Sequence, residues 1–149
     1  MELITAKNYV DTAEKVITGL ITEAKAANRN PRNPDDYKIL STSQIRKQLA
    51  MTAELSSQVS SGQSGQSGQS GIKAGTDSGL SPEVVEKVEY LRVQFVYQAG
   101  REPLVRKFVE KSGILKILKS IKSREDLLTF CKYMEALVAF RKFHGKKDD

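Results

Sequence analysis

Apolar residues recur at intervals of three and four along most of this chain, a spacing typical of amphipathic α-helices. The stripes with this spacing cover residues 9–24, 45–53, 84–99 and 127–138. No stretch alternates convincingly with a period of two, which would indicate a half-buried strand. At 149 residues the chain has the length of one domain. We therefore expect an all-α fold, a single compact bundle of five to six helices spanning residues 1–149.

Capping residues and glycines predict where these helices begin and end. Ser81 precedes a proline, which suits the first position of a helix. Ser41 and Ser123 each stand three residues before a side chain that can complete a capping box. Gly100 and Gly113 follow apolar stripes and are expected to end helices.

A repeat of glycine, glutamine and serine, GQSGQSGQSG, occupies residues 62–71. Such a composition buries too little apolar area to offset the entropy of ordering. We expect a flexible internal loop over residues 56–79. Two domains joined by a linker is the rival interpretation, but the residues before the repeat carry little core for a separate domain.

The chain is basic, with a formal net charge of +6. Up to Ser60 there are eight Lys and Arg against seven Asp and Glu, so most of the positive excess lies beyond the repeat. That balance suits a polyanionic partner. Cys131 is the single cysteine and is expected to be a buried thiol. With no secretory signal and no apolar run of membrane-spanning length, we expect a cytoplasmic protein with no membrane partner.

Residues for catalysis are sparse in this sequence. His144 is the single histidine, and no second His or Cys lies at metal-ligand spacing, so we expect no metal and no cofactor. Glycine-rich phosphate-binding motifs are absent from the sequence. Glu125 and Asp126 stand at a predicted helix start, where acids complement the helix dipole. We expect a protein that is not an enzyme. Glu135, within YMEALVAF, is expected to be buried and to need an arginine partner.

Three segments together resemble one family. They are STSQIRKQL (41–49), YLRVQFVYQAGREPLVRKFVEKSGIL (90–115) and TFCKYMEALVAFRKFHG (129–145). They look like the small subunit of type III-A CRISPR effector complexes, the Csm small subunit. The resemblance implies a compact helical protein without catalytic activity. It also implies stacking of several copies beside the backbone and large subunits, along the groove that holds the guide RNA and target RNA.

With that resemblance, we expect particular basic side chains to contact the phosphates of target RNA without reading its sequence. The expected contacts are Arg46, Lys47, Arg92, Arg101, Arg141 and Lys142, with Lys38 and Lys132 as weaker candidates. Each of these could instead belong to a solvated face, and Arg101 could cap the end of its own helix.

Two other functions stay open at this point. The chain could be a protein–protein assembly module with no direct role in RNA binding. It could also be an unrelated DNA-binding helix-turn-helix protein, with its turn between Gly100 and Pro103.

Overall fold

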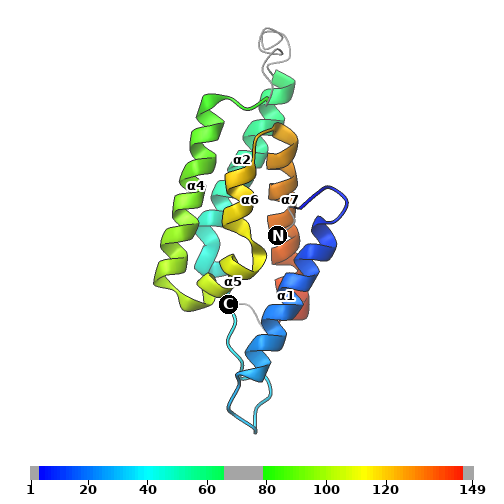
Figure 1. The fold of residues 1–149 in the computed structure, drawn as a ribbon, viewed down its shortest axis with the longest axis vertical. Helices are drawn as coiled ribbons and strands as arrows, with labels where there is room; N and C mark the ends of the chain where they lie inside the picture. Colours follow the sequence, from blue (N-terminus) through cyan, green and yellow to red (C-terminus); the bar gives the residue numbers. More distant parts are fainter. Residues whose placement is uncertain (1–3, 66–78, 146–149) are drawn as a thin grey trace.

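The computed structural model describes residues 4–65 and 79–145, and these residues form a bundle of six α-helices with one short 3₁₀ helix (Figure 1). The elements are α1 (Tyr9–Ala26), η1 (Thr42–Ile45), α2 (Arg46–Gly65), α4 (Pro82–Arg101), α5 (Pro103–Ser112), α6 (Ile114–Ser120) and α7 (Arg124–His144). The prediction of an all-α bundle of five to six helices is confirmed. No helix in the described parts is both long and apolar enough to cross a membrane.

Helix α7 connects the two sides of the bundle. It packs against α1 on one side and against α2 on another, while α4 contacts α2, α5 and α6. The stripes predicted from sequence supply the buried side chains. Ile17 of α1, Leu91 and Phe95 of α4, and Phe130 and Leu137 of α7 are almost inaccessible to solvent. Buried residues from both sides of the Gly/Gln/Ser repeat form one continuous apolar cluster.

The helix ends follow the capping signals. The Ser81 hydroxyl accepts a hydrogen bond from the Val84 amide, and the Ser123 hydroxyl accepts one from the Asp126 amide. Gly113 separates α5 from α6 with φ of +72°, a left-handed conformation in which a side chain costs about 1–2 kcal/mol. The glycine therefore permits the abrupt change of direction between these two helices.

The flexible loop was predicted to start at residue 56, but the structure places residues 56–65 in a helix. Helix α2 continues to Gly65, and Leu55 and Val59, four residues apart, are both buried. Packing of this stripe against the bundle holds a serine-rich segment in a helix that its own propensity would not favour. The remainder of the predicted loop, residues 66–78, lies outside the described residues.

The connection between α4 and α5 is too short for a helix-turn-helix unit of the ordinary kind. Helix α4 ends at Arg101 and α5 begins at Pro103, so Glu102 alone joins them. A DNA-binding helix-turn-helix has a turn of three or four residues before its recognition helix. The DNA-binding hypothesis therefore loses the feature on which it rested.

Candidate nucleic-acid interface

The 3₁₀ helix η1, which leads into α2, is joined to the end of α4 through hydrogen bonds of Gln44. Its Nε2 donates to Glu102 Oε1 at 3.2 Å, and its backbone carbonyl accepts a hydrogen bond from Gln98 Nε2 at 2.7 Å. Gln44 precedes Arg46 and Lys47, and Gln98 precedes Arg101. These contacts therefore bring three predicted cations to the same end of the bundle, the lower end in Figure 1.

All three of these cations are exposed. Arg46 and Lys47 begin α2, and no ion pair engages either of them in the part of the chain that the structure describes. Arg101 is the last residue of α4, and its guanidinium carbon lies 5.7 Å from the centre of the Tyr97 ring. A cation over an aromatic face keeps its outer edge open to solvent while its orientation is restrained. The arrangement can bind phosphate oxygens, whose recognition needs charge and donors but no reading of bases.

Arg92 lies away from this end, midway along α4. Its Nη2 lies 2.6 Å from Glu89 Oε1 on the same helix, and its side chain is about one third exposed. Arg92 also lines a shallow groove between α4 and α6, together with Val93, Val96 and Leu115. The carboxylate neutralises part of its charge, which weakens Arg92 as a phosphate ligand relative to the three exposed cations.

Arg141 lies inside the bundle rather than on its surface. It is 3% exposed, and its Nε donates to the Leu40 carbonyl at 2.7 Å. This bond fixes the segment before η1 to the last turns of α7, across 101 residues of sequence. We therefore assign Arg141 a structural role and leave it out of the set of phosphate contacts.

The other predicted cations are exposed. Lys132 lies on the outer side of α7, and Lys142 lies in its last turn. Glu135 is exposed as well, so the expectation that it is buried and needs an arginine partner was wrong.

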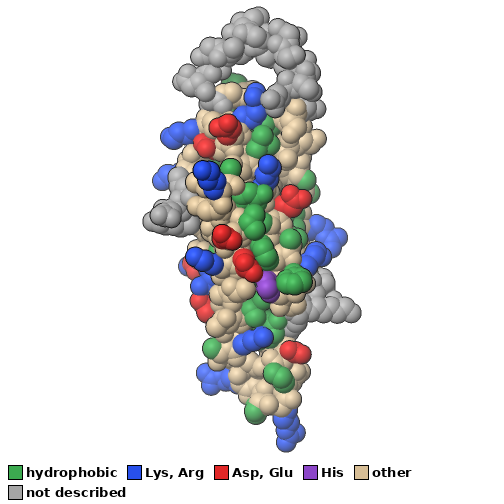
Figure 2. Space-filling view, turned by 90° about the vertical axis from the view of Figure 1, so that its right-hand side faces the viewer, with side chains coloured by type: hydrophobic (Ala, Val, Ile, Leu, Met, Phe, Trp, Pro, Cys, Tyr) green, Lys and Arg blue, Asp and Glu red, His purple; other side chains and the backbone are tan. Residues whose placement is uncertain are grey.

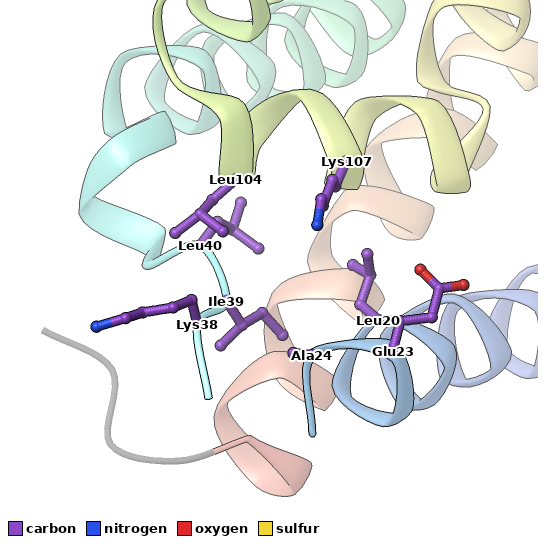
Figure 3. Close-up of a pocket in the computed structure, with 8 residues that line it drawn as sticks. All are labelled: Leu20, Glu23, Ala24, Lys38, Ile39, Leu40, Leu104 and Lys107. Atoms are coloured by element: carbon purple, nitrogen blue, oxygen red, sulfur yellow. The ribbon is translucent and has the colours of Figure 1, made fainter. Parts of the chain in front are cut away.

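Lys38 borders a small hollow between α1, α5 and the segment before η1 (Figure 3). The hollow is lined mainly by Leu20, Ala24, Ile39, Leu40 and Leu104, with Glu23 and Lys107 also on its wall. Figure 3 shows the Lys38 ammonium pointing away from these apolar side chains, and the residue is exposed.

A cationic strip on α6 was missed by the sequence analysis. Residues 101–124 contain eight Lys and Arg against two Glu, an excess equal to the net charge of the whole chain. Lys116 and Lys119 are exposed on α6, which has no acidic residue, and Lys122 follows in the connection to α7. Counting charge in a moving window, rather than on either side of the repeat, would have revealed this strip.

The face formed by α1 and α7 has a different character. Figure 2 shows a narrow band of hydrophobic side chains along this face, with positive and negative side chains mixed on both sides of it. Where the two helices meet, His144 Nε2 lies 3.4 Å from Glu14 Oε2, and the imidazole ring stacks on Phe140. His144 is therefore packed between α1 and α7.

Within the described residues, no three side chains of the types His, Cys, Asp or Glu gather where they could hold a metal ion. The one thiol, Cys131, is buried, and its Sγ lies 3.7 Å from the Thr52 carbonyl. Burial raises the pKa of this thiol to about 12. The thiol therefore stays protonated and unreactive at neutral pH.

Comparison with known proteins matches residues 14–147 to the family described as Csm2 Type III-A. The protein named CRISPR system Cms protein Csm2 from Streptococcus thermophilus is 42% identical over 148 residues, covering 99% of this chain and 100% of that protein. A protein of the same name from Mycobacterium tuberculosis (strain CDC 1551 / Oshkosh) is 37% identical over 95% of this chain and 94% of its own length. Another from Enterococcus italicus is 43% identical over 75 residues, 48% of this chain and 54% of that protein.

Proposed function

The chain belongs to the Csm2 family of type III-A CRISPR systems, and on that premise we propose that it is a non-catalytic subunit that binds RNA through its phosphates. As a family member it is a small subunit of a type III-A CRISPR complex, a multi-subunit assembly. The finer proposal is that it lines the groove for the guide–target duplex. There it contacts the target RNA backbone without sequence preference, beside backbone subunits, large subunits and copies of itself.

The observation that carries this proposal is the gathering of Arg46, Lys47 and Arg101 at one end of the bundle. Their backbones are held near one another by the hydrogen bonds of Gln44 and Gln98, so the three charges lie in one region of the surface. A cluster of exposed cations suits a polyanion, because binding phosphates needs charge and donors but no reading of bases. Lys116 and Lys119 add two exposed positive charges on α6.

Titration of labelled single-stranded RNA at several salt concentrations tests the proposal. For single strands, the logarithm of affinity falls with log salt by about 0.7 for each phosphate contact. We expect the double variant Arg46→Ala/Lys47→Ala to weaken binding for all sequences and to reduce this slope by about 1.4. The reduction should be the same for unrelated RNA sequences, because phosphates carry no sequence information.

The double variant Lys7→Ala/Lys15→Ala is the matched control, because it also removes two positive charges from exposed positions. Lys7 lies just before α1 and Lys15 lies within it. An equal loss in both variants would mean that net charge alone attracts RNA, and that the proposed contacts are not a site. Wild-type protein that binds RNA weakly, with no dependence on salt, would favour the assembly-module alternative.

A further inference from the structure

Tyr97 is an exposed aromatic side chain near the end of α4 that carries Arg101. Seven large hydrophobic side chains are exposed among the described residues, and Tyr97, at 59%, is more exposed than all of the others except Phe143. A ring so exposed contributes little to the core, and a surface helix normally carries polar residues at such positions. The ring is therefore open to a ligand.

The surroundings of Tyr97 are those of the cationic end of the bundle, the lower end in Figure 1. Arg101 lies four residues further along α4, and its guanidinium carbon is 5.7 Å from the centre of the Tyr97 ring. Gln98, the next residue after Tyr97, donates to the Gln44 carbonyl at 2.7 Å and so ties this turn of α4 to the segment that leads into α2. The aromatic ring therefore lies in the same region of the surface as the three exposed cations.

Phosphate binding alone does not need an aromatic ring. Phosphate oxygens are recognised by charge and hydrogen-bond donors, which Arg101 and its neighbours supply. A ring beside such cations adds a flat apolar surface, and the bases are the part of a nucleic acid that offers a matching flat face. The guanidinium plane of an arginine stacks on bases as well. Tyr97 and Arg101 together have the chemistry of a site for one nucleotide, with a surface for the base and charge for the phosphate.

We propose that Tyr97 and Arg101 form a stacking platform for one unpaired base of RNA. The proposal rests on the proposed phosphate contacts and extends them from the backbone of the RNA to its bases. A base inside a duplex has both faces covered by its neighbours, so the platform takes an unpaired nucleotide. Every base has a π face, so such stacking adds affinity for single strands without reading their sequence.

Tyr90 allows this site to be distinguished from exposed aromatic surface in general. It lies seven residues before Tyr97 on the same helix, about 10 Å away along the axis, and it is 52% exposed. No cation lies over the Tyr90 ring in the part of the chain that the structure describes. Tyr90 therefore offers the same side chain at similar exposure, but without the cation that Tyr97 has.

Titration of two labelled oligomers with the wild-type protein and its variants tests the proposal. One is oligouridylate, whose bases stack little on one another, and the other is an oligomer of abasic phosphate units with the same length and charge. We expect wild type to bind oligouridylate more tightly than the abasic oligomer. Tyr97→Ala should weaken oligouridylate binding by about fivefold or more, as expected for the loss of one base stacked on an aromatic ring. It should leave abasic binding and the salt slope for either oligomer unchanged, because it removes no charge.

Conservative variants separate stacking from plain apolar contact. Tyr97→Phe keeps a ring and should bind oligouridylate as wild type does. Tyr97→Leu keeps apolar surface without a π face and should lose affinity as Tyr97→Ala does. Tyr90→Ala is the matched control and should leave the binding of both oligomers unchanged. Circular dichroism of each variant confirms that it is folded, as expected for substitutions at exposed positions.

Several outcomes would overturn the proposal. If Tyr97→Ala weakened the binding of both oligomers equally and lowered the salt slope, the ring would only orient Arg101. If wild type bound both oligomers equally, or if Tyr97→Ala changed the binding of neither, no base would stack on the ring. An equal loss in Tyr90→Ala would assign the effect to exposed aromatic surface in general. These outcomes leave the phosphate contacts standing, whereas a wild-type protein that bound neither oligomer would refute the RNA-binding proposal as well.

Discussion

Removing the Arg141 side chain should destabilise the fold rather than RNA binding alone. In Arg141→Ala the Leu40 carbonyl loses a donor at 2.7 Å in a site where the arginine is 3% exposed. A hydrogen bond to a charged group contributes about 1.5–3 kcal/mol, and leaving a buried acceptor without a partner costs about 1–3 kcal/mol. Because these contributions overlap, we expect a loss of about 3 kcal/mol in the free energy of unfolding.

Urea unfolding followed by circular dichroism measures this loss. With a slope of about 1–3 kcal/mol per molar urea, a loss of about 3 kcal/mol lowers the midpoint by roughly 1–3 M. Arg141→Lys should fall between wild type and Arg141→Ala, because lysine keeps the charge but has no Nε at the same place. Gly145→Ala should act in the same direction, since a Cβ there would collide with Nη1 and the carbonyl of Arg141.

Lys132→Ala is the control, because Lys132 lies on the same helix but is exposed, and such changes stay within about 0.5 kcal/mol. The reasoning fails if Arg141→Ala leaves the urea midpoint within the range of this control. A lower salt slope for RNA binding with unchanged stability would refute it more directly. That result would place Arg141 among the phosphate contacts after all.

Three further predictions concern the interior and the helix ends. Tyr133→Phe should lower the free energy of unfolding by about 1 kcal/mol in urea, because the buried hydroxyl donates to the Ser112 carbonyl at 2.8 Å. The Cys131 thiol, with its pKa raised from 9.0 to about 12, should stabilise the fold below pH 9 and lose that contribution as the pH rises toward 12. The urea midpoint of wild type should therefore fall more steeply over this range than that of Cys131→Ala. Gly113→Ala should cost about 1–2 kcal/mol, read from thermal unfolding, because its φ of +72° disfavours a side chain.

The sequence predicted the helices well because their stability comes from apolar stripes that are visible in the pattern itself. Capping residues placed the starts of α4 and α7 to within a residue. The resemblance to the Csm small subunit is confirmed by the match to the family over nearly the whole chain. The helix positions and the family resemblance could both be predicted because they depend on local sequence patterns. Such patterns are visible without any information about tertiary contacts.

The errors on α7 came from reading neighbours in sequence instead of positions around the helix. Arg141 continues the spacing of three and four that joins Phe130, Met134 and Leu137, so its burial was present in the pattern. Glu135 is adjacent to Met134 in sequence but points about 100° away from it around the helix. A helical projection of α7 would have predicted a buried Arg141 and an exposed Glu135.

Other features depend on contacts that no local pattern contains. The hydrogen bonds of Gln44 to Gln98 and Glu102 span more than fifty residues, and they bring Arg46 and Arg101 to one end of the bundle. The continuation of α2 past Ser56 likewise depends on burial of Val59 by other helices.

The packing of α1 against α7 determines when α1 can reach its native contacts during translation. Helix α1 makes more contacts with α7 than with any other element, yet α7 is the last helix to be synthesised. At roughly 5–20 residues per second, the ribosome needs on the order of 6–25 s to proceed from the end of α1 to the end of α7. Over that interval the apolar stripe of α1 lacks its main packing partner. The stripe therefore stays exposed on the nascent chain until α7 has been synthesised and can pack against it.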